Sequence, residues 1–187
     1  MGLFNARWFN RDNSGTSAWR VIDDSELLPE ARLAASLPLQ VIYASETGVT
    51  EQLALDTVRR LQESGVSVRL LRFDALDMSM LAVAEQVLFL VSTCCDGDPP
   101  EMADGFHRKY MREPSRLPGL RYGLLAVGDS SYDDFCAFGR QLHQWLQASG
   151  AHTLFEPVRM DNEDDAAATQ WFDCIDSLVQ SHAAPIA

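Results

Sequence analysis

From residue 38 onward, apolar and polar positions follow two alternating patterns. Short apolar runs of strand length cover residues 39–44, 66–73, 86–91, 121–127 and 152–160. Stretches with apolar residues at helical spacing cover residues 51–65, 75–85, 102–113, 137–150 and 164–180, the second weakly and the third over a short length. Strands that alternate with helices need crossover connections. The pattern therefore predicts an α/β fold with a five-stranded parallel sheet and helices on both faces.

The ends of the predicted helices carry local signals as well. Gly65 and Gly150 close two of them, and acidic residues open the last one, where they suit the positive end of the helix dipole. In open parallel sheets, ligands bind outside the carboxyl ends of the strands. The functional site is therefore expected in the loops after the first, third and fourth strands.

Residues 1–37 lack this alternation. The run NRDNSGTS is polar and turn-rich, and Pro29 interrupts a possible short helix. The sequence thus predicts an N-terminal arm or linker over residues 1–37, a globular domain over 38–182 and a C-terminal tail over 183–187. Trp8, Phe9 and Trp19 either pack back onto the domain or mark an interaction site.

The composition is that of an ordinary globular domain, with 47% hydrophobic and 22% charged residues among 187. No apolar run approaches the ~18 residues of a membrane span. The N-terminus also lacks the apolar core of a secretory signal. We therefore expect a cytoplasmic protein with no direct membrane insertion.

The charge and the cysteines narrow the function classes further. A formal net charge of -12 disfavours nucleic acid and anionic lipid as partners, and it agrees equally with plain solubility and with docking onto a basic protein. The four cysteines form no C-x-x-C pair and have no zinc-type spacing to a histidine. No metal site is expected, and a reducing compartment is favoured over a disulfide scaffold.

The loop after the first strand reads SETGVTE, residues 45–51, and leads directly into a helix. A helix N-terminus offers free N–H groups and a positive dipole, and Gly48 permits a close backbone approach. The loop contains neither Lys nor Arg, and it fits neither the G-x-x-x-x-G-K-[ST] nor the G-x-G-x-x-G pattern. Either Thr47 or Thr50 caps the helix, or the loop holds a phosphate through neutral donors.

The sequence allows two interpretations of each of the other two loops. The loop after the third strand reads STCCDGDPP, residues 92–100, and its adjacent cysteines suggest a thiol site. The neighbouring carboxylates of Asp96 and Asp98 disfavour a reactive thiolate, however. The loop after the fourth strand reads GDSSYDDFCAFG, residues 128–139. Its Tyr132 and Phe135 either stack on a planar ligand or anchor the following helix.

Taken together and in this order, the three loops resemble those of the flavodoxin-like FMN-binding domains, in particular the FMN domain of NADPH–sulfite reductase flavoprotein and its diflavin relatives. SETGVT is similar to that family's S-x-T-G-x-[TA] phosphate loop, and STCCDGDPPE to its S-T-x-G-[ED]-G-[ED]-P-P-[ED] loop. VGDSSYDDFC is similar to its L-G-D-[ST]-S-Y-x-x-F-C segment. The resemblance covers residues 38–180 and implies a three-layer flavodoxin-like fold with the strand order 2-1-3-4-5.

The resemblance also implies how FMN is held. Residues 45–50 would hold its phosphate, residues 93–95 would line one edge of the isoalloxazine ring, and Tyr132 would stack on one face of the ring. The protein would bind, orient and tune the flavin, so no catalytic acid, base or nucleophile is assigned. The implied FMN contacts are Ser45, Glu46, Thr47, Gly48, Val49, Thr50, Ser92, Thr93, Cys94, Cys95, Asp96, Gly97, Val127, Gly128, Asp129, Ser130, Ser131, Tyr132, Asp133, Phe135 and Cys136.

Two positions depart from the family pattern. Cys94 stands where the family has an outer stacking aromatic residue, and Cys95 replaces a glycine. A thiol buries less area than a tyrosine and stacks less well. We therefore expect a more exposed ring face and a weaker affinity for FMN.

The function implied by the resemblance is FMN-dependent electron transfer from a flavin reductase to a basic acceptor protein. The chain contains no FAD- or NADPH-binding domain, so no complete site for NADPH oxidation is expected in it. It would act as a stand-alone carrier or as the FMN module of a larger reductase. Two alternatives remain open at this point: a flavin-free interaction or regulatory module with the same fold, and an FMN-dependent quinone reductase.

Overall fold

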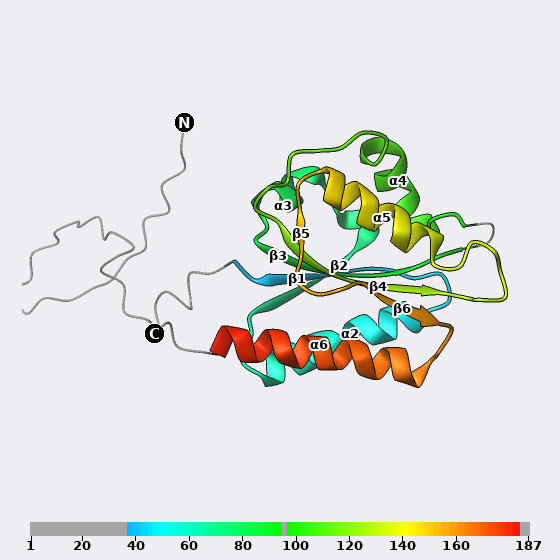
Figure 1. Cartoon of the computed structure of the whole chain (residues 1–187). Coiled ribbons are helices and arrows are strands. Elements are labelled where there is room, and N and C mark those ends of the chain that lie inside the picture. The colour runs from blue at the N-terminus through cyan, green and yellow to red at the C-terminus, as the bar shows by residue number, and fades with distance from the viewer. Residues whose placement is uncertain (1–36, 95–96, 184–187) are drawn as a thin grey trace, which may run out of the picture. The chain divides into compact units, whose positions relative to one another are not determined.

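The computed structural model describes residues 37–94 and 97–183. The elements follow in the order β1 (Leu39–Ala44), α2 (Val49–Glu63), β2 (Val68–Arg72), the 3-10 turn η2 (Phe73–Ala75), α3 (Met78–Val83), β3 (Gln86–Ser92), α4 (Glu101–Tyr110), β4 (Arg121–Gly128), α5 (Ala137–Ala148), β5 (His152–Thr153), β6 (Val158–Asp161) and α6 (Asp165–Ala183) (Figure 1). Residues 1–36 and 184–187 lie outside the described part of the chain. The predicted arm and tail therefore stay predictions.

The strands form one parallel sheet in the order β2-β1-β3-β4-β5, with β6 also paired to β4. Helices α2 and α6 cover one face of the sheet, and α3, α4 and α5 cover the other (Figure 1). The predicted three-layer fold and its strand order are confirmed. The carboxyl ends of β1, β3 and β4 meet at one edge of the sheet, because parallel strands all run the same way.

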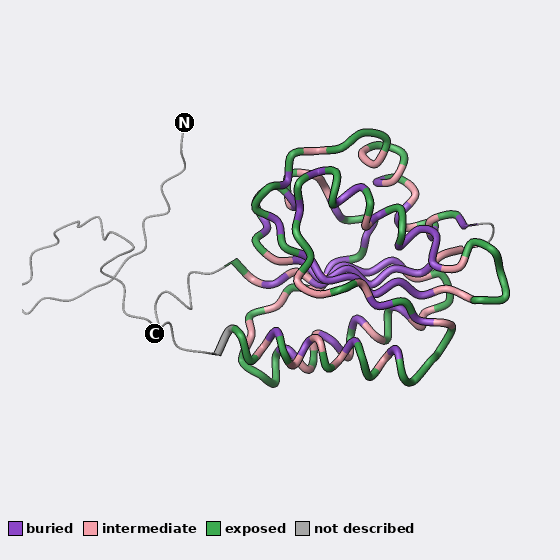
Figure 2. The backbone as a smooth tube through the Cα atoms, in the orientation of Figure 1, coloured by how far each residue is buried: buried purple, intermediate pink, exposed green. Residues whose placement is uncertain are grey.

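The period-2 alternation of strand side chains produces two separate cores, one on each face of the sheet. Figure 2 shows the buried strands between the two layers of helices. On β1, Ile42 and Ala44 join the core beneath α4 and α5. Val41 and Tyr43, one position away, join the core beneath α2 and α6. Both faces of the central strands are thus buried, which explains why these strands are largely apolar, with Gln40 near the start of β1 as an exception.

The fifth strand differs from its prediction. A single strand was expected over residues 152–160, but two short segments, β5 and β6, pair with β4 instead. Between them the ring of Phe155 lies over Gly123, where an added Cβ would come within 2.5 Å of the ring. Phe155 also packs edge-on against Trp171, with 5.5 Å between the ring centroids. Packing of this aromatic side chain, together with Pro157, which has no N–H to donate, interrupts the ladder.

Side-chain hydrogen bonds join α2 and α6, the two helices that cover one face of the sheet. The indole N–H of Trp171 on α6 donates to the hydroxyl of Thr57 on α2 over 2.9 Å in a fully buried setting. At the surface, Arg60 donates two hydrogen bonds, of 2.6 and 2.5 Å, to the carboxylate of Asp176. The middle and the last turn of α2 are therefore tied to α6. Within the described residues, no helix is long and apolar enough to cross a bilayer.

Helix α5 approaches β4 closely at Gly139. A Cβ at this position would overlap the Cβ of Ala126 on β4. The absent side chain lets the helix lie directly on the strand, so the start of α5 stays close to the carboxyl end of β4. This contact determines the path of the loop that joins the two elements.

Replacing Gly139 by alanine should therefore destabilise the fold. Overpacking of the helix–sheet contact should outweigh the gain in helix propensity and lower the free energy of unfolding by about 1–3 kcal/mol. Gly105 on α4 is a matched control, since a Cβ there would meet nothing within 4 Å. Gly105→Ala should raise stability by up to about 1 kcal/mol. Urea unfolding measures the free energy of unfolding of both variants. If Gly139→Ala were as stable as Gly105→Ala, the contact between α5 and β4 would not require glycine at position 139.

Candidate functional site

The loops after β1, β3 and β4 converge at the carboxyl edge of the sheet, as the sequence predicted. Hydrogen bonds join the first two loops, because the N–H of Glu46 donates to the hydroxyl of Ser92 over 3.2 Å. That hydroxyl in turn donates to the carbonyl of Ala44 at the end of β1, over 3.3 Å. Ser92 is buried, so its contribution is to hold the first loop in place.

Thr93 joins the second loop to the third. Its N–H donates to the carbonyl of Val127 over 3.0 Å, and its hydroxyl accepts from the N–H of Phe138 in the first turn of α5, over 3.2 Å. A first-turn helix N–H has no carbonyl partner within the helix. Thr93 satisfies one such group and pins the start of α5 against the second loop.

The first loop forms an open turn at the start of α2. Gly48 precedes the helix with a φ of 97°, in the left-handed region, and its N–H donates to the hydroxyl of Ser45 over 2.9 Å. A Cβ at Gly48 would meet nothing within 4 Å, so the space above the turn is open. Thr47 is exposed beside it, and Thr50 is almost fully buried in the first helical turn. Neither threonine side chain caps the helix.

Two contacts of this loop were not predicted from the sequence. The hydroxyl of Tyr43 on β1 donates to the carboxylate of Glu51 over 2.8 Å, and burial followed by this bond raises the pKa of Tyr43. The Glu51 carboxylate in the first turn of α2 is thereby held by the sheet. The N–H of Ser45 donates to the sulfur of Met102 on α4 over 3.4 Å. Neither partner carries a motif signal, so only the fold brings them together.

The second loop closes on itself and packs against the third. Cys94 donates its N–H to the carbonyl of Asp98 over 2.9 Å, and the two residues form an isolated antiparallel bridge. Gly97 has a φ of 89°, and a Cβ there would lie 3.0 Å from the Cβ of Asp134. Glycine thus permits both the turn and the close approach of the two loops. Cys95 and Asp96 lie outside the described residues, so their predicted contacts stay predictions.

The third loop is a series of local turns. The Asp129 carboxylate accepts from both the N–H and the hydroxyl of Ser131, over 2.9 and 2.6 Å, and these bonds lower the pKa of Asp129. Tyr132 follows with 61% of its side chain exposed. An exposed aromatic residue at this edge of the sheet offers a face to a planar ligand. Phe135 lies nearer the body of the protein and is half-buried.

Cys136 faces the core. It is fully buried, adopts a left-handed φ of 54°, and donates its thiol to the carbonyl of Ala126 over 3.2 Å. Gly128 makes room for it, since a Cβ there would lie 2.7 Å from the backbone nitrogen of Cys136. Burial raises the pKa of the Cys136 thiol to about 11. This thiol therefore helps to anchor the loop and is poorly suited to redox chemistry.

The predicted site residues in the described part of the chain thus fall into two groups. Exposed or half-exposed positions open to the edge of the sheet are Ser45, Glu46, Thr47, Gly48, Val49, Thr93, Cys94, Gly128, Asp129, Ser130, Ser131, Tyr132, Asp133 and Phe135. Buried positions that support these loops are Thr50, Ser92, Gly97, Val127 and Cys136. A direct contact between any of them and a ligand stays a prediction. In the described residues, no group of three or more His, Cys, Asp or Glu is arranged to bind a metal.

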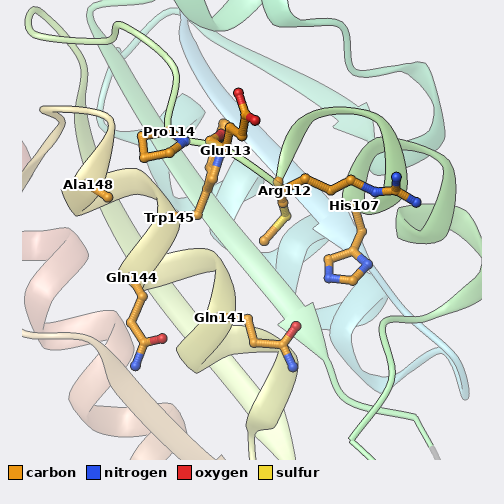
Figure 3. Close-up of a pocket in the computed structure, with 9 residues that line it drawn as sticks. His107, Arg112, Glu113, Pro114, Gln141, Gln144, Trp145 and Ala148 are labelled. Atoms are coloured by element: carbon orange, nitrogen blue, oxygen red, sulfur yellow. Dashed lines mark hydrogen bonds between the residues drawn. The ribbon is translucent and has the colours of Figure 1, made fainter.

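A cavity of about 330 Å³ lies elsewhere, between the end of α4 and α5 (Figure 3). Its lining includes His107, Arg112, Gln141 and Trp145. The indole N–H of Trp145 already donates to two backbone carbonyls, those of Tyr110 and Glu113. No described residue of the three loops lines this cavity, so it is separate from the site at the sheet edge.

Comparison with known proteins identifies the class. The family model for flavodoxin matches residues 41–171, and the chain belongs to the flavodoxin family. The cofactor of this family is FMN. The turn at Gly48 fits the phosphate of that cofactor, because it combines an open left-handed glycine, an exposed hydroxyl and the free N–H groups of α2.

Among curated proteins, the chain is 38% identical over 142 residues to the sulfite reductase [NADPH] flavoprotein alpha-component of Vibrio cholerae, covering 74% of this chain and 23% of that protein. It is 33% identical over 141 residues to the alpha-component of Bacillus subtilis, covering 75% and 23%. The chain therefore spans about a quarter of the length of these relatives.

Solved structures agree on the fold. The flavodoxin of Streptococcus pneumoniae TIGR4 superposes with a TM-score of 0.67 at 23% identity, covering 78% of this chain and 99% of that one. Oxidised Flavodoxin 1 of Bacillus cereus gives a TM-score of 0.64 at 20% identity, covering 81% and 100%. The compact flavodoxin architecture is thus present in full within this chain.

The buried Cys136 thiol should make the protein sensitive to alkali. Its pKa is raised to about 11 in the folded state from an ordinary value of 9.0, so the folded protein holds this proton more tightly than the unfolded chain does. The stabilisation is complete below pH 9 and is lost as the pH rises toward 11. Between these limits the free energy of unfolding should fall by up to about 1.4 kcal/mol per pH unit from this group alone.

Urea unfolding from pH 8 to 10.5 tests this expectation, with Cys136→Ala as the control. The variant should lose the part of the slope that comes from Cys136 while keeping the part that comes from Tyr122, whose pKa burial raises to about 12. Identical slopes for the variant and the wild type would show that Cys136 is not the titrating group.

Proposed function

We propose that this chain binds FMN at the carboxyl edge of its sheet and uses it to pass electrons between proteins. The observation that carries the proposal is the convergence of three loops. A phosphate-type turn, a loop of small residues and a loop with an exposed tyrosine are joined by the hydrogen bonds of Ser92 and Thr93. Membership of the flavodoxin family supports the same conclusion. When bound, FMN supplies the one- and two-electron redox chemistry that amino-acid side chains lack.

Each loop has its own task in this proposal. The N–H groups at the start of α2 and the hydroxyls of Ser45 and Thr47 hold the phosphate without any positively charged side chain. The segment at Thr93 and Cys94 lines one edge of the flavin ring. Tyr132 covers one face of the ring, and residues 127–136 follow the ring and the ribityl chain. The protein thus orients the flavin with part of its edge open to a partner.

The partners in this proposal are a flavin reductase as the electron donor and a basic redox protein as the acceptor. Exposed carboxylates of Asp98, Glu101, Asp133 and Asp134 surround the site. They attract a positively charged surface and bring it to the flavin edge. The sulfite reductase flavoprotein relatives suggest that the chain serves a reductase of this kind, and we place it in the cytoplasm on the same grounds.

Binding of FMN and of riboflavin by the purified protein tests the proposal directly. The wild type should bind FMN and quench its fluorescence, and it should bind riboflavin more weakly because riboflavin has no phosphate. Thr47→Val should weaken FMN binding about tenfold, since a hydrogen bond to a charged group contributes about 1.5–3 kcal/mol. The same variant should leave riboflavin binding unchanged.

Thr169→Val on α6 is the matched control, because this exposed hydroxyl bonds only within its own helix, to the carbonyl of Asp165. A wild-type protein that binds neither flavin would favour the flavin-free module over an electron carrier. Turnover of a quinone by the protein alone with NAD(P)H would favour the quinone reductase. If Thr47→Val weakened the binding of both flavins equally, the FMN phosphate would not be bound at this turn.

The acidic surroundings of the site should make electron transfer sensitive to salt. The rate from the reduced protein to a small basic haem protein such as cytochrome c should fall about tenfold between about 20 and 200 mM salt, as screening removes the attraction. Neutralising Asp98 and Glu101 together as Asp98→Asn and Glu101→Gln should lower the rate at low salt. The control pair Glu63→Gln and Glu85→Gln removes exposed charges at the opposite end of the sheet. If both pairs had the same effect, net charge alone would explain the rates.

A further inference from the structure

The last residue of β6, Asp161, bonds to the third loop although it belongs to none of the three loops. The carboxylate of Asp161 accepts from the N–H of Ser130 over 2.9 Å, and its second oxygen accepts from the Ser130 hydroxyl. Both carboxylate oxygens are therefore directed at one residue of the loop. This pairing joins positions 31 apart in the sequence.

Asn162, the next residue, continues the connection. Its N–H donates to the carbonyl of Gly128 over 2.7 Å, and its side-chain amide donates to the carboxylate of Asp161 over 3.2 Å. A further bond from the Asn162 side chain contributes to lowering the pKa of Asp129. Asn162 has a left-handed φ of 52°, a conformation that asparagine tolerates better than most residues. The turn is thus shaped so that two consecutive residues reach the loop.

The break in the fifth strand explains how this turn comes to lie there. Phe155 leaves the sheet to pack over Gly123, and the chain re-enters the ladder as β6 beside the last part of β4. In that register Asp161 lies directly opposite Gly128, the last residue of β4. Gly128 is also the first residue of the third loop. The carboxyl end of β6 is therefore placed against the start of the loop.

The other described hydrogen bonds of residues 129–134 are local. Ser131 bonds to Asp129, and the N–H of Tyr132 donates to the carbonyl of Asp129 over 3.2 Å. The described bonds that tie this exposed segment to another element come from Asp161 at the end of β6 and from Asn162 after it. A loop of six residues held only by local turns would sample many conformations, and ordering it costs roughly 1–2 kcal/mol per residue.

We infer that Asp161 is a positioning residue for the flavin. By holding Ser130, it keeps the third loop, and with it Tyr132, in the arrangement that receives the ring before the flavin arrives. Binding then does not have to order the loop, so affinity is higher. The inference rests on the proposed FMN function, and it concerns the ring and ribityl part of the ligand rather than its phosphate.

The test uses Asp161→Ala and Ser130→Ala, with Asp164→Ala as the matched control. Asp164 lies three positions after Asp161, between β6 and α6, but its carboxylate accepts from the N–H of Ala166 at the start of α6. The Asp164→Ala variant therefore removes the same charge and a similar hydrogen bond without changing any contact to the third loop. Ser130→Ala removes the hydroxyl bond to Asp161 with no change of charge.

Asp161→Ala should weaken FMN and riboflavin binding by the same factor, about tenfold, because the loss lies away from the phosphate. Ser130→Ala should weaken both by a smaller factor, and the double variant should be no weaker than Asp161→Ala alone. Asp161→Asn, which keeps an acceptor oxygen, should recover part of the loss. Asp164→Ala should leave both affinities unchanged.

A second readout needs no flavin. Amide hydrogen exchange at residues 130–132 of the flavin-free protein should speed up about tenfold in Asp161→Ala, while the strands exchange as in the wild type. Wild-type flavin affinity in Asp161→Ala, even with a lowered unfolding temperature, would overturn the inference and show a purely structural role. A loss confined to FMN, or unchanged exchange in the loop, would overturn it too. A wild-type protein without flavin affinity would instead refute the proposed function.

Discussion

The close contact between α5 and β4 controls the geometry of the site. Gly139 lets the helix rest on Ala126, and Gly128 leaves room for the backbone of Cys136. The chain must therefore leave β4 and re-enter α5 within a short distance, so the intervening loop projects beyond the sheet edge and exposes Tyr132. The buried, left-handed Cys136 anchors the base of this loop. Thr93 then ties the same helix start to the second loop, so this packing contact positions the second and third loops relative to each other.

The electrostatics of the site follow from a chain with a net charge of -12. In the proposed function, a doubly charged phosphate would be held beside Glu46 and Glu51 with no basic residue in the turn. Oriented N–H groups and hydroxyls serve this purpose because they supply positive potential only at short range. The Tyr43 hydroxyl engages the Glu51 carboxylate at the sheet. In the same proposal, the wider acidic surface stays available to a basic partner, so cofactor and partner would be recognised by different means.

The sequence predicts the fold well where burial determines the pattern. The apolar run at residues 39–44 and the helix over 137–150 both appear within two residues of their predicted bounds, because each buries a continuous face. The fifth strand was predicted as one piece, since nothing local shows that Phe155 packs over Gly123. The three loops were found from their motifs and from the rule for parallel sheets. Asp161 and Met102 were missed because their partners are distant in sequence, although a carboxylate at the end of a strand was a signal that the same rule could have used.

Mapping amide chemical shifts as flavin is added tests the central claim most directly, namely that FMN binds across all three loops at once. On addition of FMN, we expect shifts at residues 45–51, 92–98 and 127–138, together with shifts at residues 161 and 162, which contact the third loop. Riboflavin should reproduce the shifts of the second and third loops and leave most of those at the start of α2 absent. Shifts concentrated around the cavity between α4 and α5, or no shifts at the turn of Gly48, would contradict binding of FMN across the three loops.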